Sequence, residues 1–416
     1  MMLQIPQVRI FDSTLLLALN GYRFISQQCQ CYQTDIFQTR LLFKKTICFQ
    51  GEEAARVFYD TEKFSRQGAA PKRLQKTLFG KDGVQGLDGD AHRHRKQMFM
   101  SLMSDKGIKQ LADLTREQWY NYAQKWSQSD RVVLFEEARE ILCRAACTWT
   151  GVPLSESEVT GRTKDLGAMI DGSGTVGLKH WQGRRSRKQV EKWIEDIIEQ
   201  VRNSRLEIPE DRALYSIANH RDLEGNLLDK HTAAVEIINL IRPTVAIARY
   251  VIFAALALHE HPECRQKLQN GEDDYYQWFV QEVRRFYPFF PFAAAVVDRD
   301  FDWQDYHFPQ GTKVLLDLYG TNHDPQLWNN AEDFTPERFC DWNGSKFALI
   351  PQGGGDYYTN HRCPGEWITI ELMKVSLNFL TQSLQYDVPK QDLEIPLSTM
   401  PTAPKSGFVI SNVSPS

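Results

Sequence analysis

The chain has 416 residues, of which 42% are hydrophobic, 25% charged and 12% aromatic, and its formal net charge is −4 at pH 7. This length can bury a large core, and the near-balanced charge gives no reason to expect nucleic acid or an anionic membrane as a partner. The start of the chain lacks the pattern of a secretory signal. Arg242, Pro243 and Arg249 interrupt the longest apolar stretch, residues 237–258, so it falls short of the roughly 18 apolar residues that span a membrane. We expect a cytoplasmic protein without stable insertion into a membrane.

The pattern along the chain predicts a mainly helical protein with small β-sheets. Residues 39–49 are expected to form a strand region, residues 52–64 a short helix, and residues 80–89, with four glycines, a loop. Hydrophobic periodicity then predicts a series of helices at 92–103, 108–127, 134–150, 156–170, 189–202, 233–260 and 275–287.

The last third of the chain is expected to be more mixed. A β-like segment at 293–318 and an irregular region at 322–342 precede a glycine-rich loop, one more helix, and a β-like segment near 407–413. No repeat or linker divides the sequence, so we predict a single domain over residues 1–416. Its β-structure is expected mainly near 1–60, 293–318 and 390–416.

Cys363 lies at the end of the glycine-rich loop, in the sequence PQGGGDYYTNHRCPGEW that begins at Pro351. Pro364 suits the first position of a helix, and Glu366 has the spacing of a capping box with Cys363 as its N-cap. A sulfur at the positive end of a helix dipole is favoured as thiolate, the form that acts as nucleophile or metal ligand. We expect Cys363 to be a metal ligand; the alternative is a small buried residue at a helix start.

The other seven cysteines show no paired C-x-x-C spacing. Cys29 and Cys31 lack a matching second pair, which argues against a zinc site. We expect them to be reduced thiols, as is usual for a cytosolic protein.

Glu282 and Arg285 are three residues apart on a predicted helix and share one of its faces. The helix continues into the apolar run FYPFFPFAAAVV, so the pair should be buried and should need a further partner. Arg338, in the segment PERF, is expected to be that partner. The alternative is an exposed pair that contributes about 0.3 kcal/mol.

Arg242 and Pro243 lie in the middle of the long apolar helix. No residue within one turn of Arg242 along the predicted helix, such as Ile238, Asn239 or Val245, is acidic. A guanidinium in apolar surroundings needs an anion, so we expect a bound anionic ligand; the alternatives are a side chain that reaches solvent or a distant acid. Pro243 removes a helical hydrogen bond and should distort the helix.

The E-x-x-R pair, the PERF segment and the Cys-Pro-Gly loop follow one another as in the cytochrome P-450 superfamily, which this sequence resembles. The resemblance implies haem b, held by Cys363 between the long central helix and the helix after the cysteine loop. The usual loop has Phe and Gly where this sequence has Asp356 and Thr359, and only His361, Cys363 and Gly365 fit.

Arg242-Pro243 stands where ordinary members carry an acid–threonine pair that delivers protons to dioxygen. With the long cysteine loop and the glycine-rich region around Gln85, this resembles the bacterial fatty-acid peroxygenases of the superfamily. The resemblance implies hydroxylation of medium- or long-chain fatty acids at Cα or Cβ by hydrogen peroxide, without an obligatory redox partner. In catalysis, Arg242, followed by Pro243, would pair with the fatty-acid carboxylate, which would act as the acid and base.

Several further residues receive roles only through this resemblance. Gln85 occupies a substrate-binding and catalytic position where hydroxylating relatives carry Gln and alkene-forming relatives tend to carry His. The apolar substrate pocket would be lined by Leu78, Phe79, Phe289 and Phe292. The haem would be held by His92 and Lys96, with help from Arg66, and by the loop residues His361 and Gly365.

Two basic clusters have other interpretations. Basic residues near His92, at positions 72, 73, 76, 93 and 95, could mark a nucleic-acid site, but the net negative charge argues against it. Arg184, Arg185, Arg187 and Lys188 are expected to form a solvated helix face.

Three functional alternatives remain beside the peroxygenase. A conventional monooxygenase would depend on redox partners, and a decarboxylase would form terminal alkenes. A haem-binding sensor would have no catalytic activity.

Overall fold

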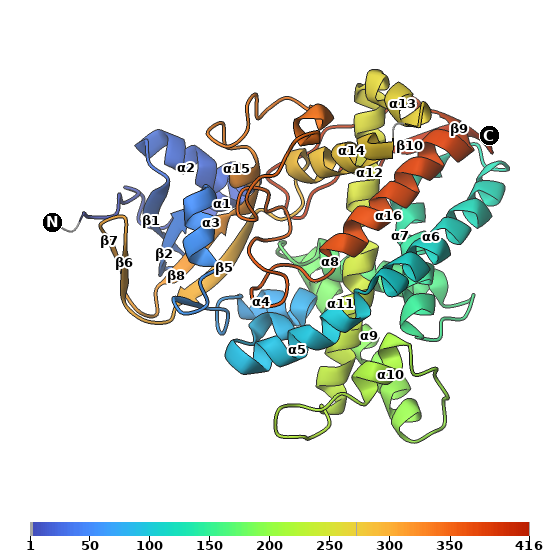
Figure 1. Cartoon of the computed structure of the whole chain (residues 1–416), viewed down its shortest axis with the longest axis horizontal. Coiled ribbons are helices and arrows are strands. Elements are labelled where there is room, and N and C mark those ends of the chain that lie inside the picture. The colour runs from blue at the N-terminus through green and yellow to red at the C-terminus, as the bar shows by residue number, and fades with distance from the viewer. Residues whose placement is uncertain (1–2, 272, 416) are drawn as a thin grey trace.

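The computed structural model describes residues 3–271 and 273–415. Helices dominate, and the sheets lie mainly at the N-terminal side of the molecule in Figure 1. This confirms the predicted mainly helical fold with small sheets. The helices are α1 (Thr14–Asn20), α2 (Phe24–Tyr32), α3 (Glu52–Phe58), α4 (Lys72–Leu74), α5 (Gly89–Leu102), α6 (Asp105–Trp126), α7 (Leu134–Thr150), α8 (Val159–Asp171), α9 (Leu178–Arg202), α10 (Ala213–Ala218), α11 (Lys230–Ala246), α12 (Ala248–Glu260), α13 (Pro262–Gln269), α14 (Asp273–Phe286), α15 (Leu318–Asn322) and α16 (Glu366–Asn378). Short helical turns are η1 (Gly21–Arg23), η2 (Gln75–Phe79), η3 (Val84–Gly86), η4 (Pro336–Phe339) and η5 (Phe379–Ser383).

Within the described residues, the strands form three sheets. A five-stranded sheet has the order β1-β2-β8-β5-β3, in which only β2 and β8 are parallel. A second sheet has the order β4-β10-β9, and β6 and β7 form a hairpin. The strands are β1 (Ile36–Leu41), β2 (Lys44–Phe49), β3 (Phe64–Ser65), β4 (Val132–Val133), β5 (Phe292–Val297), β6 (Phe301–Trp303), β7 (Tyr306–Phe308), β8 (Lys313–Asp317), β9 (Leu384–Asp387) and β10 (Val409–Pro415).

The strand region predicted at 39–49 is a tight hairpin of two strands. Leu42 and Phe43 form the turn with φ values of 50° and 62°, as a two-residue turn between right-twisted strands requires. Apolar residues without glycine occupy this turn, so no turn signal is present in the sequence there.

The long apolar segment forms α11 and α12, which are buried almost all round. In the described residues, Lys230–Glu260 is the one segment long and apolar enough to cross a membrane, but 94% of its apolar window is buried inside the protein. A helix that is hydrophobic on all sides belongs in a large core. The helix continues through Pro243 and is interrupted at Ile247, four residues later. Proline removes the hydrogen bond to residue 239, on its N-terminal side, so this interruption does not test the distortion expected at Pro243.

Asp317, the N-cap of α15, is buried next to the core of the five-stranded sheet. One of its oxygens accepts a hydrogen bond of 2.7 Å from the Gly320 N–H. Burial raises the pKa of Asp317 to about 7, and Asp324 adds repulsion.

This raised pKa predicts a pH-dependent stability. The folded protein holds a proton on Asp317 that the unfolded chain releases at its lower pKa. The extra proton on Asp317 therefore contributes its full share to the free energy of unfolding below about pH 4. As the pH rises above that value, this contribution falls by about 1.4 kcal/mol per pH unit until the pH passes the pKa of the folded state. Asp317→Asn keeps an oxygen for Gly320 and cannot ionise. Urea unfolding of both proteins between about pH 5 and 8 should show the variant gaining stability relative to wild type as pH rises; a constant difference would contradict the assignment.

Candidate functional site

A cavity lies among α5, α11 and the loop that precedes α16. It brings together predicted site residues from six separate parts of the sequence, namely Phe79, Gln85, His92, Lys96, Arg242, Pro243, Phe289, His361, Cys363 and Gly365. None of the described residues that line it is Asp or Glu. The cavity therefore offers a thiol, cations and apolar side chains, but no carboxylate of its own.

Three predicted residues do not line this cavity. Leu78 is buried in the main core, and Phe292 is a strand residue that packs beside α2 and β1. The Arg66 guanidinium lies 4.1 Å from the centre of the Phe58 ring and donates a hydrogen bond of 3.2 Å to the Ala294 carbonyl. Each is held by neighbours that sequence spacing does not reveal.

Cys363 reaches the cavity from the loop rather than from the helix. α16 begins at Glu366 with Gly365 as its N-cap, so the capping box predicted for Cys363 is wrong. The Cys363 N–H donates instead to the Gln352 carbonyl at 3.2 Å, and the Gln352 Nε2 lies 3.8 Å from the Cys363 Sγ. Burial raises the pKa of the free thiol, whereas a bound metal cation would favour the thiolate.

Glu366 pairs with two arginines, and its carboxylate is therefore not available to accept the Cys363 N–H. It forms a buried ion pair with Arg284, and its two oxygens accept from Arg362 at 2.7 and 3.0 Å. Arg284 also donates to the Gln352 Oε1 at 3.2 Å. The sequence analysis missed Arg284 and Gln352. The adjacent arginines at 284 and 285 were the available signal, since both are buried and each needs its own carboxylate.

His92, Lys96 and His361 form one side of the cavity. The rings of His92 and His361 stack with their centroids 3.9 Å apart, and the His361 Nε2 lies 3.4 Å from an Asp88 oxygen. The Lys96 Nζ donates to the carbonyls of Asn360 and Arg362. This cluster ties α5 to the cysteine loop and places basic groups at the cavity edge.

Arg242 enters the cavity from α11 without an acidic partner among the described residues. Its side chain is 6% exposed, one nitrogen donates to the Asn239 Oδ1 at 3.4 Å, and its Nε has no partner. Burial lowers the pKa of Arg242 to about 9, and Arg187 adds repulsion. The guanidinium is thus a buried cation with unused donors directed to a cavity, as an anion-binding residue requires.

Asn239 connects Arg242 to the loop before α5. Its Nδ2 donates to the Gln85 Oε1 at 3.2 Å and to a Glu236 oxygen at 2.9 Å. Glu236 is fully buried but paired with Arg95 at 2.7 Å, so its charge is neutralised behind the cavity wall. Gln85, Asn239 and Arg242 therefore form one hydrogen-bonded chain, of which the sequence analysis had assigned only the two ends.

Arg187 is not part of a solvated helix face, and that prediction is wrong. It is 1% exposed, its Nε pairs with Glu191 at 2.6 Å, and NH1 donates to the Leu78 carbonyl at 2.9 Å. It occupies the buried stripe of α9 together with Gly183, Val190 and Ile194, because the helix begins at Leu178 rather than near 189. Extending this stripe backwards along the sequence would have identified it.

Removing the Arg187 charge should destabilise the protein. Arg187→Met leaves Glu191 and the Leu78 carbonyl without their donor, at a cost of about 2 kcal/mol. Lys188→Met, at the exposed neighbouring position, should stay within about 0.5 kcal/mol of wild type. Denaturant unfolding compares the two variants. Equal free energies of unfolding would show that the buried ion pair of Arg187 does not stabilise the protein.

The predicted cluster of Glu282, Arg285 and Arg338 is formed in the structure. Both oxygens of Glu282 accept from Arg285 at 2.8 Å, and Arg338 lies 3.1 Å from one of them. Arg285 also donates to the carbonyls of Asn322, Ala331 and Asp333. The cluster fastens α14 to the segment that leads into the cysteine loop.

The cavity residues fit the haem that the sequence resemblance implies. The Cys363 Sγ is a soft ligand, and the other described donor groups near it are the Gln352 amide and the Gly365 N–H. The basic residues His92 and Lys96 lie at one edge, where they suit the carboxylates of a porphyrin, and Phe99, Ile247 and Ile368 supply apolar walls. No group of three or more His, Cys, Asp or Glu residues that could hold another metal occurs in the described part of the chain.

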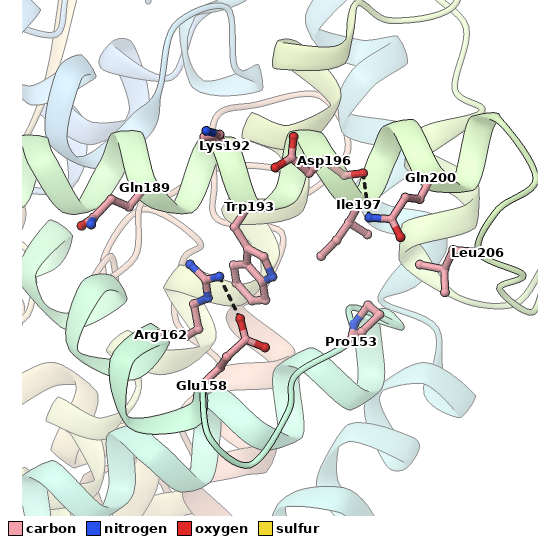
Figure 2. Close-up of a pocket in the computed structure, with 10 residues that line it drawn as sticks. All are labelled: Pro153, Glu158, Arg162, Gln189, Lys192, Trp193, Asp196, Ile197, Gln200 and Leu206. Carbon is pink, nitrogen blue, oxygen red and sulfur yellow. Dashed lines mark hydrogen bonds and ion pairs between the residues drawn. The ribbon is translucent and has the colours of Figure 1, made fainter.

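A second hollow, of about 590 Å³, lies on the surface between α8 and α9 (Figure 2). It contains none of the predicted site residues. Its Glu158 and Arg162 pair with each other at 3.0 Å, and Arg162 lies over the Trp193 ring. Of its charged groups, Glu158 and Arg162 therefore satisfy each other.

Sequence comparisons identify a common family. A model of the family described as cytochrome P-450 matches residues 176–411. Among curated proteins, cytochrome P-450 71A8 of Mentha piperita is 26% identical over 242 residues, or 51% of this chain and 47% of that protein. (+)-Menthofuran synthase of the same plant is 32% identical over 205 residues, or 42% of this chain and 40% of that protein. The match thus spans less than half the length of these curated relatives.

Solved structures are similar over the full chain. A variant of cytochrome P-450SP alpha (CYP152B1) is 47% identical with a TM-score of 0.95, covering 97% of this chain and 99% of that one. Cytochrome P-450EX alpha (CYP152N1) with myristic acid is 45% identical with a TM-score of 0.97, covering 100% of both chains. A variant of cytochrome P-450 OleT in complex with arachidonic acid is 38% identical with a TM-score of 0.97, covering 100% of this chain and 99% of that one. The chain belongs to the cytochrome P-450 family, in the fatty-acid peroxygenase group that its sequence resembles.

Proposed function

We propose that this chain is a haem-thiolate peroxygenase that hydroxylates medium- or long-chain fatty acids at Cα or Cβ with hydrogen peroxide. Haem b is the cofactor of the family, and Cys363 would be its protein ligand, with His92, Lys96 and His361 at its edge. When bound, a thiolate-ligated haem supplies the oxygen-transfer chemistry. The observation that carries the proposal is Arg242, a buried cation that lines the same cavity as Cys363 and has no acidic partner among the described residues.

Arg242 would bind the fatty-acid carboxylate through its unused donors. Asn239 holds the guanidinium from α11, and Gln85 holds Asn239 from the preceding loop, so the bound carboxylate would have a fixed position. Because no Asp or Glu lines the cavity in the described residues, the substrate carboxylate would accept and return the proton of hydrogen peroxide as general base and acid. The acid–base group of the reaction would therefore arrive with the substrate.

Gln85 favours hydroxylation over decarboxylation. A neutral amide hydrogen-bonds but does not carry a proton near pH 7, unlike a histidine. Its carbonyl oxygen is already used by Asn239, which leaves the amide nitrogen for the substrate side.

Two relatives support a fatty acid as the substrate, since their structures contain myristic acid and arachidonic acid. The apolar side chains Phe79, Val84 and Phe289 would accommodate the acyl chain. We propose further that the enzyme needs no redox partner and acts in the cytoplasm.

One experiment tests the function. Purified haem-loaded protein is mixed with myristic acid and hydrogen peroxide without any reductase, and the products are analysed by mass spectrometry. The expected product is a 2- or 3-hydroxy acid. The corresponding fatty alcohol should be inert, and addition of a short carboxylic acid should restore turnover of neutral substrates. Activity only with NADPH and redox proteins would instead identify a conventional monooxygenase, a terminal alkene a decarboxylase, and no turnover a haem-binding sensor.

A further inference from the structure

Glu236 of α11 is a fully buried carboxylate that connects three elements behind the cavity wall. Its Oε1 accepts from the Val84 N–H of η3 at 2.9 Å and from Arg95 of α5 at 2.7 Å. Its Oε2 accepts from the Asn239 Nδ2 at 2.9 Å. All three partners are donors, so the carboxylate acts toward each of them as an acceptor. Hydrogen bonds of this charge-assisted kind are strong, and they hold the three donors at defined positions.

The carboxylate determines which way the Asn239 amide points. A side-chain amide carries an NH2 donor on one side and an acceptor oxygen on the other. The Asn239 Nδ2 faces Glu236, and its Oδ1 accepts from Arg242 at 3.4 Å. The three residues are spaced three positions apart and share one face of α11. The reverse orientation would set acceptor against acceptor at Glu236 and donor against donor at Arg242, so only one orientation satisfies both neighbours.

This orientation is passed on to Gln85. The Asn239 Nδ2 also donates to the Gln85 Oε1 at 3.2 Å, so Gln85 turns its oxygen to α11 and keeps its NH2 for the cavity that it lines. The backbone of the loop is held at the same point, because the adjacent Val84 N–H is bonded to Glu236. A Cβ added to Gly83 would lie 3.0 Å from the Gln85 Oε1 and 3.1 Å from the Asn239 Nδ2. The loop therefore packs closely against α11 where the two amides meet.

We propose that Glu236 is a positioning residue that fixes the polarity of the Asn239 and Gln85 amides. Gln85 would then present a donor to a carboxylate bound at Arg242. Glu236 is not among the described residues that line the cavity, so it would act through the amides and not by contact with the ligand. A carboxylate held by donors from η3 and α11 has a defined orientation, which places its Cα and Cβ. This last step rests on the proposed function.

Arg95 provides the alternative explanation, in which Glu236 serves only to neutralise a buried cation. The combined substitution Arg95→Met and Glu236→Gln removes both charges and leaves the net charge beside the cavity unchanged. Replacing a buried ion pair by uncharged residues of similar size is often tolerated, so this variant should fold. The new amide would keep its oxygen for the Val84 N–H and turn an NH2 toward Asn239. Either the amides of Asn239 and Gln85 then reverse, or two donors oppose each other on α11.

Equilibrium binding of myristic acid to the haem-loaded protein, without peroxide, tests this role. The wild-type pair and the combined substitution are compared with Gln85 present and in a Gln85→Ala background. With Gln85 present, the combined substitution should weaken binding about tenfold or more, because a donor to a charged group is lost or reversed. With Gln85→Ala, most of this effect should disappear, since the amide that carries it is absent. The substitutions should therefore be coupled by about threefold or more.

Two results would overturn the role of Glu236. An equal loss of affinity in both backgrounds would show that Glu236 acts only by holding the fold, and an unchanged affinity would show that it does not orient the amides. A wild-type protein that does not bind myristic acid would overturn it as well. Thermal unfolding without ligand checks that each variant is folded. Glu236→Gln alone introduces the same amide beside an intact Arg95 and gives a second measurement of the coupling to Gln85.

The same proteins separate this role from the proposed function. With peroxide, the ratio of 2-hydroxy to 3-hydroxy acid should differ between wild type and the combined substitution of Arg95 and Glu236. A wild-type protein that binds myristic acid but forms no hydroxy acid would contradict the proposed function. In that case the coupling between Glu236 and Gln85 in binding would still support the positioning role.

Discussion

Replacing Arg242 by methionine should lower peroxide-driven turnover of fatty acids about 100-fold or more, since a buried carboxylate would lose its counter-charge. The same variant should be at least as stable as wild type in the absence of fatty acid. Arg242 has a partnerless Nε and no acidic partner among the described residues, so its burial costs free energy that methionine does not. An activity lost without loss of stability is the signature of a binding residue.

Fatty-acid stabilisation gives a second readout of this variant. A ligand at about 100 times its dissociation constant raises the free energy of unfolding by about 2.7 kcal/mol, so myristic acid should raise the melting temperature of wild type and leave Arg242→Met unchanged. Arg95→Met is the matched control. Arg95 is also a buried arginine near this site, but it pairs with Glu236 at 2.7 Å. Its loss should destabilise the protein with or without fatty acid. If Arg242→Met behaved like Arg95→Met, Arg242 would be a structural residue.

Replacing Glu282 by alanine should cost about 3–5 kcal/mol of folding free energy, because it leaves the fully buried Arg285 without a counter-charge. Arg285 would retain three backbone carbonyls, but these do not neutralise its charge. Glu282 also accepts from the Thr335 N–H at 2.8 Å, so the segment leading to the cysteine loop should loosen. Since a domain of this kind is stable by only about 5–15 kcal/mol, the variant should accumulate poorly as haem-loaded protein.

The control for this variant is an exposed pair of the same spacing. Glu53 and Arg56 are also three residues apart on a helix, at 3.4 Å, with side chains 65% and 51% exposed. Glu53→Ala should change the free energy of unfolding by about 0.5 kcal/mol or less. Chemical unfolding measures both proteins, and equal effects would show that burial does not determine the contribution of the Glu282 cluster.

The helices were predictable where periodicity is strong. Residues 134–150 form a helix with the bounds that the sequence indicated, because one apolar stripe runs along the whole segment. The start of α9 was missed by eleven residues, since polar residues and a tryptophan obscure its stripe. The hairpin at 36–49 was predicted as one strand region because its turn contains Leu42 and Phe43 instead of glycine or asparagine.

The candidate site was predictable as a set of residues but not as a network. Arg242, Gln85, Cys363, His92 and Lys96 do line one cavity. Their connections run through Asn239, Gln352 and Arg284, which local spacing does not distinguish from other polar residues. Each of these contacts depends on how separate elements pack together, for example residues 284 and 366, which are 82 positions apart.

By itself, the sequence determined the chemistry that depends on local order. An arginine without an acid within one helical turn, a proline beside it and a cysteine after a glycine-rich loop are properties of short segments, and they indicated the anion, the helix distortion and the metal ligand. Only the tertiary structure decided which buried charges are already paired. Glu236 lies near Arg242 but pairs with Arg95 of α5. Arg187 pairs with Glu191 in its own helix and donates to the Leu78 carbonyl of η2. Pairing of this kind depends on packing between distant segments, and among the described residues it leaves Arg242 at the cavity without an acidic partner.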